Sequence, residues 1–246
     1  MRTNRREYSQ VIQAIQNFQI KFNIVLNPNE IGNNLTKFWQ IILKGGSKSI
    51  YRLAKKTSKT CSSFAKWETL FNEQIPWKQI FTKISKTTTD PQLKWFQIRT
   101  IHRLIPTNRF LHLRSIKDSP MCTFGCNIEE TLSHLFYNCP KIGLFWNQIL
   151  VWIKANCTNC DFLSFSEQLI LFGHKKNVIT DKVIDLLIVV GKWHIYKCKL
   201  QDREPLFDVF KQQFKTRYLI ERGIYKALCK IEYFHELWIP YANLIA

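Results

Sequence analysis

The sequence predicts a mainly α-helical fold, on three observations. Apolar residues recur at helical spacing from Ser63 towards the C-terminus. Proline, serine, threonine and glycine stand where helices are expected to begin or end. The 246 residues are 46% hydrophobic and 14% aromatic, which is enough to bury a core. The chain shows no internal repeat and no heptad array.

The N-terminal third is basic and less regular than the rest. Residues 1–66 carry twelve Lys and Arg against two acids, Glu7 and Glu30. Residues 55–63 have the composition of an exposed basic linker. We therefore expect a basic N-terminal segment over 1–64, a helical domain over 65–240 and a short tail over 241–246.

The helical part contains start and stop signals in sequence order. Pro76 fits the first position of a helix, and a second helix is predicted over 92–105, ended by the proline that follows. Thr107 or Asn108 can cap a third helix that runs to about Arg114. Later helices are expected over 129–137, from Pro140, from Ser166 to near Gly173, over 181–199, from Pro205 to a break near Gly223, and on to Trp238. The helix over 181–199 is apolar nearly all round, so it should be buried, with Lys192, Lys197 and Lys199 at its C-terminal end.

A cysteine and histidine cluster lies between these helices. Cys122, Cys126, His134 and Cys139 have the spacing C-x3-C-x7-H-x4-C. Three thiolates and one imidazole can close a tetrahedral shell around one zinc ion, and Gly125 can take the positive φ that such a turn favours. Four protein ligands leave no position for a catalytic water, so the site would be structural. The alternative is three buried thiols and a satisfied histidine.

Other cysteines do not extend this site. Cys157 and Cys160 form a second CxxC, but no further ligand pair lies at a suitable spacing, and we interpret them as core or surface thiols. Eight cysteines in a chain whose N-terminus is polar and charged, unlike a signal peptide, favour a reducing compartment. The expected location is the cytoplasm or the nucleus, without secretion.

The net charge indicates the kind of partner. A formal charge of +18 favours a polyanion, and nucleic acid is the usual one, with an anionic membrane surface as the second choice. No apolar run approaches the length of a membrane span. Polymerase chemistry needs clustered carboxylates, yet the chain has seven aspartates and no adjacent pair. We therefore expect no enzymatic activity.

The residues around the cluster resemble a known family. KWFQIRTIHRLIPTNRFL (94–111), CTFGCNIEETLSHLFYNC (122–139) and PKIGLFWNQIL (140–150) follow one another as in the zinc-binding region after the reverse transcriptase domain of LINE-type non-LTR retrotransposon polyproteins. The resemblance covers roughly 65–240. It implies that Cys122, Cys126, His134 and Cys139 bind one structural Zn²⁺, although the family more often has C-x2-C at the first pair.

The resemblance also implies a function. The family's segment is implied to bind RNA with little sequence preference and to assist the polymerase, here a reverse transcriptase supplied in trans. A chain with this region alone is expected to be a truncated element copy or a gene fragment. Two alternatives to a nucleic-acid-binding module stay open: a scaffold domain that docks on a polymerase, and a relic with no independent function. The oligomeric state is not predicted.

Candidate nucleic-acid contacts are basic side chains near the cluster and in the linker. Trp95 and Phe96 alternate with arginines on the helix over 92–105, where bases could stack, or where both rings could instead lie in the core. The basic candidates are Arg99, Arg103, Arg109, Arg114, Lys117, Lys55, Lys56 and Lys59.

Overall fold

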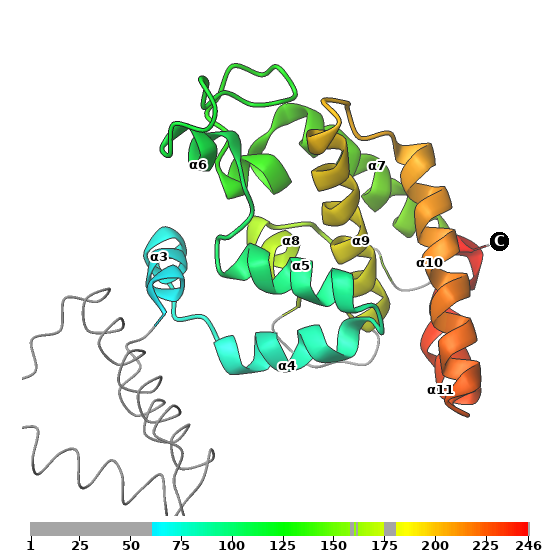
Figure 1. Cartoon of the computed structure of the whole chain (residues 1–246). Coiled ribbons are helices and arrows are strands. Elements are labelled where there is room, and N and C mark those ends of the chain that lie inside the picture. The colour runs from blue at the N-terminus through cyan, green and yellow to red at the C-terminus, as the bar shows by residue number, and fades with distance from the viewer. Residues whose placement is uncertain (1–60, 158–159, 161, 175–180, 246) are drawn as a thin grey trace, which may run out of the picture. The chain divides into compact units, whose positions relative to one another are not determined.

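Helices joined by turns make up the part of the chain that the structure describes (Figure 1). The computed structural model describes residues 61–157, 160, 162–174 and 181–245. The helices are α3 (Ser62–Phe71), α4 (Trp77–Thr87), α5 (Pro91–Ile101), α6 (Asn108–His112), the π-helix η1 (His134–Asn138), α7 (Pro140–Asn156), α8 (Glu167–Phe172), α9 (Asp181–Leu200), α10 (Phe207–Ala227), α11 (Ile231–Trp238) and the 3-10 helix η2 (Ile239–Leu244). Within those ranges the isolated bridge between Met121 and Glu129 is the sole β pairing. The mainly α fold is confirmed. Residues 1–60 of the predicted N-terminal segment fall outside the described residues, whereas α3 begins at Ser62, inside the predicted exposed linker, and Ser63 is buried.

Several helix starts lie where the sequence placed them, because local capping decides them. The Thr107 hydroxyl accepts a hydrogen bond from the amide of Phe110, and α6 follows it. Ser166 caps α8 in the same way, and α8 ends at Gly173, whose φ is +80°. Pro140 is the first residue of α7. These ends depend on neighbouring residues alone, so the sequence was sufficient to find them.

The helix predicted over 92–105 is shorter than expected. α5 ends at Ile101, and Arg103 takes a left-handed conformation with φ +57°. The free carbonyl of Ile101 accepts a hydrogen bond of 2.8 Å from the indole nitrogen of Trp67 on α3. A partner 34 residues away therefore satisfies the helix end, which local sequence signals could not indicate.

Two expectations for the C-terminal half were wrong. α10 passes through the exposed Gly223 without a break and ends at Ala227. The chain turns instead at Cys229, which has φ +54°. Lys192 does not lie at the end of α9. It is fully buried in the middle of that helix and donates hydrogen bonds to Gln97 and to the carbonyl of Leu171.

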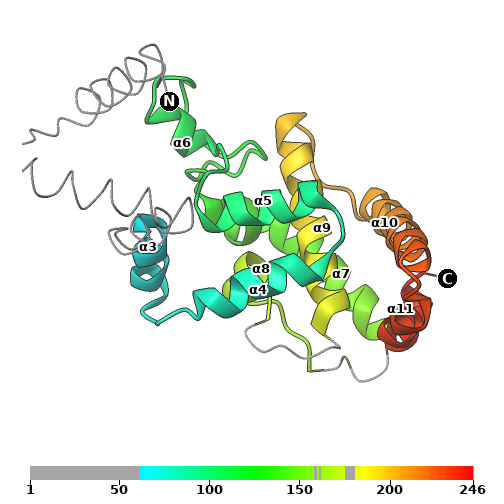
Figure 2. The same ribbon diagram turned by 60° about the horizontal axis from the view of Figure 1, so that its bottom comes forward.

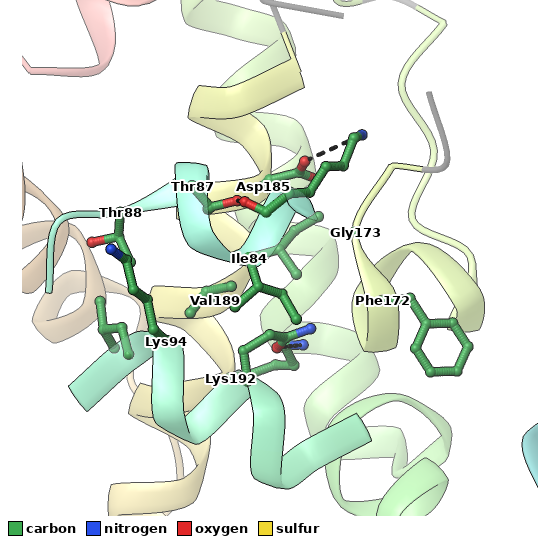
Figure 3. Close-up of a pocket in the computed structure, with 13 residues that line it drawn as sticks. Ile84, Thr87, Thr88, Lys94, Phe172, Gly173, Asp185, Val189 and Lys192 are labelled. Atoms are coloured by element: carbon green, nitrogen blue, oxygen red, sulfur yellow. Dashed lines mark hydrogen bonds and ion pairs between the residues drawn. The ribbon is translucent and has the colours of Figure 1, made fainter. Parts of the chain in front are cut away.

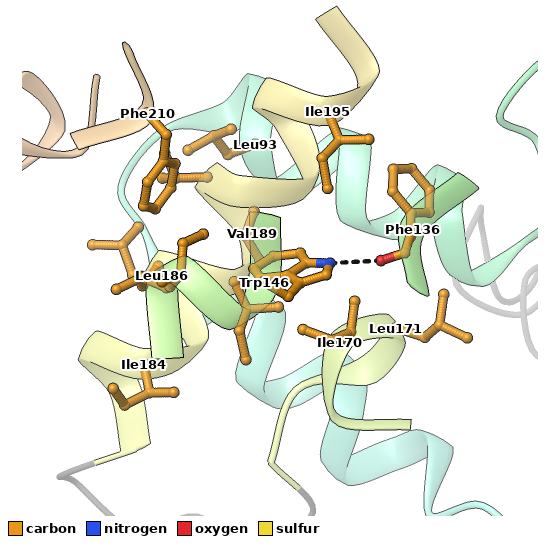
Figure 4. Packing of buried hydrophobic residues seen from close by; sticks show 14 of the residues in the cluster. Leu93, Phe136, Trp146, Ile170, Leu171, Ile184, Leu186, Val189, Ile195 and Phe210 are labelled. Carbon is orange, nitrogen blue, oxygen red and sulfur yellow. Dashed lines mark hydrogen bonds between the residues drawn. The ribbon is translucent and has the colours of Figure 1, made fainter. Parts of the chain in front are cut away.

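The buried helix α9 lies at the centre of the arrangement. It contacts α4, α5, α8, α10, α11 and η1, and Figure 2 shows α4 and α5 on one side of it. Trp146 of α7 lies within this core and donates a hydrogen bond of 2.7 Å to the carbonyl of Phe136 (Figure 4). Gly191 of α9 allows this approach, because a Cβ there would lie 2.6 Å from the Trp146 ring. α9 is the buried central helix that the sequence predicted.

Among the described residues, no helix combines the length and the apolar character that crossing a bilayer requires.

Candidate functional site

The first pair of cysteines lies in a tight turn. The amide of Cys122 donates to the carbonyl of Ile128 at 2.9 Å, and the amide of Gly125 donates back to the carbonyl of Cys122 at 3.1 Å. Gly125 has φ +76°, the conformation that glycine takes most easily. The extra residue between the two cysteines is thus accommodated inside the turn.

The second pair lies at either end of the π-helix. His134 is the first residue of η1, and Cys139 follows it as the residue that precedes α7. The helix expected over 129–137 begins later, at Leu132, because Glu129 instead pairs with Met121 in the β-bridge. The wider π turn carries the chain from the histidine to the cysteine, and both side chains are buried.

The four predicted ligands come together. Their ligand atoms all lie within 4.8 Å of one another. Cys139 Sγ is 3.9 Å from Cys122 Sγ and 3.9 Å from Cys126 Sγ, and His134 Nε2 is 3.0 Å from Cys126 Sγ. Thiolates bound to zinc at about 2.3 Å lie roughly 3.8 Å apart, so these residues fit a tetrahedral zinc shell. Cys157 and Cys160 join no third such ligand in the ranges that the structure describes.

Hydrogen bonds favour a thiolate at one of these cysteines. The thiol of Cys122, followed by the backbone amides of Ile142 and Lys141 at the start of α7, lowers the pKa of Cys139 to about 5. The pKa of Cys122 is raised, chiefly because its thiol donates to Cys139. A metal-binding cysteine must lose its proton, so Cys139 is prepared for that role.

A buried carboxylate organises the turn around the first pair. Glu130 is 0% exposed and accepts hydrogen bonds from the Thr123 amide at 3.0 Å and the Thr123 hydroxyl at 2.8 Å. The amide of Asn108, the first residue of α6, donates to it at 2.8 Å. The ammonium of Lys199, near the end of α9, lies 3.2 Å away. One side chain thus joins the metal-ligand turn, α6 and α9.

Three of the predicted nucleic-acid contacts line one groove beside this turn. We call it the arginine groove, a hollow of about 600 Å³. It is lined by Arg103 just after α5, Arg109 on α6, Arg114 just after α6, and Lys66 on α3. Thr131 and Leu132, just before η1, form its border with the ligand cluster.

The electrostatics of the arginine groove favour an anion. Burial first, and repulsion by the charge of Arg109 second, lower the pKa of Arg103. Arg103 also lies over the ring of Trp67 at 4.5 Å, and Arg114 lies over the ring of Phe110 at 3.6 Å. The carboxylate of Glu129 is 3.2 Å from Arg109, but that pair is half exposed to solvent and therefore weak.

The remaining candidates lie elsewhere. Arg99 does not line the arginine groove, and Lys117 donates to the side chain of Asn108 at 3.0 Å. Phe96 is 2% exposed and belongs to the core, whereas Trp95 is 61% exposed. Lys55, Lys56 and Lys59 fall outside the described residues.

Sequence reasoning missed two residues of the site. Glu130 and Lys199 pair across 69 positions of sequence, and no short motif links them. A glutamate within an otherwise turn-forming segment carries no signal that it will be buried, because its partners are two backbone amides, a hydroxyl and a distant lysine.

One stretch of the chain, which includes the ligand cluster, matches a known family. Residues 46–146 match the family described as zinc-binding in reverse transcriptase. The match includes all four clustered ligands and the residues of the arginine groove, and it ends at Trp146 in α7. This stretch is a zinc-binding region of the reverse transcriptase type, as the resemblance indicated. From residue 147 onward the resemblance stays a prediction.

One curated protein is similar over part of the chain. It is a chloroplastic pentatricopeptide repeat-containing protein of Arabidopsis thaliana, 35% identical over 77 residues. The similarity involves 29% of this chain and 8% of that protein. This chain therefore matches only a small part of that relative's length.

Proposed function

We propose that this chain is a non-catalytic, zinc-stabilised module that binds single-stranded RNA and derives from the C-terminal region of a non-LTR retrotransposon reverse transcriptase. The observation that carries the proposal is the arginine groove. Three separately predicted arginines meet there, next to the ligand cluster of a zinc-binding family.

Zinc has a structural role in this proposal. Cys122, Cys126, His134 and Cys139 hold one Zn²⁺, and the closed shell leaves no open position for a reacting water. The ion supplies folding energy to a segment with little regular structure between α6 and η1. It thereby fixes the turn against which Glu130 anchors α6 and its arginines.

RNA suits the chemistry of the arginine groove. Guanidinium groups hold phosphates, and bases stack on aromatic rings and on arginine planes. Phe110 and Arg114 already form such a stacked pair in the groove. Because guanidinium groups contact phosphates whatever the base, binding should depend on charge and show little sequence preference.

The experiment is a titration of labelled single-stranded RNA at several salt concentrations, with the double variant Arg109→Gln, Arg114→Gln. Loss of two phosphate contacts should reduce the slope of log K against log salt by about 1.4, at about 0.7 per phosphate on a single strand. The matched control is Lys78→Gln, Lys154→Gln, which removes the same charge from exposed positions outside the groove. The proposal fails if the wild type shows no salt-sensitive binding, or if both variants weaken binding equally.

A docking function is the second candidate, supported by an apolar surface near the ligand cluster. Leu113 is 71% exposed and Ile116 is 68% exposed, and Met121 and Ile128 are also exposed. A reverse transcriptase supplied in trans would be the partner. Co-purification with that enzyme, lost on Ile116→Ser and Met121→Ser while RNA binding persists, would support docking, whereas unchanged co-purification would exclude this surface.

A further inference from the structure

A second basic groove lies near the opposite end of α5. It measures about 490 Å³ and is bordered by the end of α4, the turn into α5, the start of α9, and α10 with α11. Figure 1 shows α4 and α6 on opposite sides of α5. We call it the lysine groove after the side chains that α4, α5 and α9 contribute to it: Lys83, Lys86, Lys94 and Lys182.

Two of these lysines are already engaged. Lys83 is buried and donates to the carbonyl of His174 at 2.5 Å, with Asp185 at 3.7 Å. Lys182 donates to the hydroxyl of Tyr225 at 2.7 Å. Asp185 is the one carboxylate among the described lining residues, and its charge is directed to Lys83 and His174.

The other two lysines are available to a ligand. Lys86 is exposed and Lys94 is half-buried, and neither side chain has a hydrogen-bond or ion-pair partner among the residues that the structure describes. A second hollow adjoins them and shares Thr87, Thr88 and Lys94 with the groove. Figure 3 shows Lys94 reaching it from α5 and Asp185 and Lys192 from α9. The lining of the lysine groove therefore carries two uncompensated positive charges.

The opposite wall of the lysine groove is aromatic. The rings of Tyr225 and Tyr233 lie 6.1 Å apart at an angle of 29°, and Lys182 stands 5.2 Å and 5.3 Å from the two ring centres. Tyr233 is 40% exposed, so part of its side chain is open to solvent. Cations on one side and an open aromatic ring on the other form the combination that holds a nucleotide of a single strand.

We propose that the lysine groove is a second contact for the RNA strand, with backbone phosphates on Lys86 and Lys94 and a base on Tyr233. This inference rests on the proposed function and extends it. From Lys94 to His102, where the arginine groove begins, α5 and its end span about 12 Å at 1.5 Å per residue. A single strand of ordinary site size, about 4–16 nucleotides, can reach both grooves.

The test uses a single-stranded RNA of roughly 20 nucleotides, long enough to cover both sites. The double variant Lys86→Gln, Lys94→Gln should reduce the slope of log K against log salt by about 1.4, and Lys78→Gln, Lys154→Gln should not. Since neither lysine has a hydrogen-bond or ion-pair partner among the described residues, thermal melting should be unchanged. RNA carrying 5-iodouridine should cross-link on irradiation to the peptide that contains Tyr233, and Tyr233→Leu should remove that cross-link.

The outcomes separate this inference from the proposed function. If the wild type does not bind RNA, both fail. If the arginine variant weakens binding while the lysine variant behaves as the control, or if cross-links map to the arginine groove alone, the second contact is wrong and the proposed function stands.

Discussion

The carboxylate of Glu130 accepts a hydrogen bond of 2.8 Å from the backbone amide of Asn108. Through this contact the turn that carries Cys122 and Cys126 holds the start of α6. Arg109 lies on α6, and Arg114 follows just after its end. The candidate metal centre and the arginine groove are therefore parts of one structure. A substitution that disrupts the metal centre should therefore also alter the arginine groove, and the reverse.

Replacing Glu130 by Gln should be strongly destabilising. The substitution leaves the ammonium of Lys199 buried without a carboxylate. It also places an amide NH₂ group opposite backbone N–H donors, so the free energy of unfolding should fall by about 3–5 kcal/mol. Chemical denaturation measures the loss. Glu129→Gln is the matched control, because its pair with Arg109 is half exposed and should contribute no more than about 1 kcal/mol. Equal effects of the two substitutions would show that Glu130 is not the anchor.

Removing the metal should destabilise the protein. We expect one zinc per chain by elemental analysis in the wild type, and none in Cys126→Ser, which lacks one ligand. The loss of stability should be large, because apparent binding energies of structural zinc are about 10–16 kcal/mol in small zinc modules. A chelator should lower the Tm of the wild type and leave that of the variant unchanged. Cys229→Ser alters an exposed thiol outside the cluster and should retain the metal. Identical melting of the wild type with and without chelator would contradict a structural ion.

Glycines in two helices should respond to alanine in opposite directions. Gly191→Ala places a Cβ 2.6 Å from the buried ring of Trp146 and should cost about 1–3 kcal/mol. Gly143 and Gly223 are exposed within α7 and α10, with nothing near an added Cβ. Alanine there should stabilise by roughly 0.5–1 kcal/mol. If Gly223→Ala lowers the stability instead, the helix would be broken at Gly223, as the sequence predicted.

The buried Lys192 should make stability depend on pH. Burial lowers its pKa from 10.5 to about 7. Below pH 7 the folded and unfolded chains both carry the proton, and the cost of burying the charge is present in full. Between pH 7 and 10.5 the unfolded chain keeps a proton that the folded chain has released, so the free energy of unfolding rises with pH by about 1.4 kcal/mol per unit.

Lys192→Met isolates this contribution. The variant loses the donor to Gln97, a cost that does not change with pH, and it loses the titrating group. The difference in unfolding free energy between wild type and variant, measured from pH 7 to 10, should therefore grow in favour of the wild type. A difference that stays constant over this range would show that Lys192 remains charged in the fold.

Sequence patterns located most helices and the ligand cluster for a physical reason. Caps at Thr107 and Ser166, the proline at position 140 and the apolar faces of α7 and α9 act over a few residues. A distant residue, Trp67, sets the end of α5 by its hydrogen bond to Ile101, and there the sequence-based helix boundary was wrong by four residues.

By itself, the sequence determined that the chain is mainly helical, strongly basic and furnished with a C-x3-C-x7-H-x4-C cluster, because composition, periodicity and spacing are local properties. Only the tertiary structure decided which charges are free and which are buried. All four lysines are located on or beside predicted helices, and nothing in the sequence distinguishes them. Yet Lys192 and Lys199 are buried with polar partners, whereas Lys86 and Lys94 line an open groove. Burial depends on packing between helices that are far apart in the chain, and no local pattern encodes it.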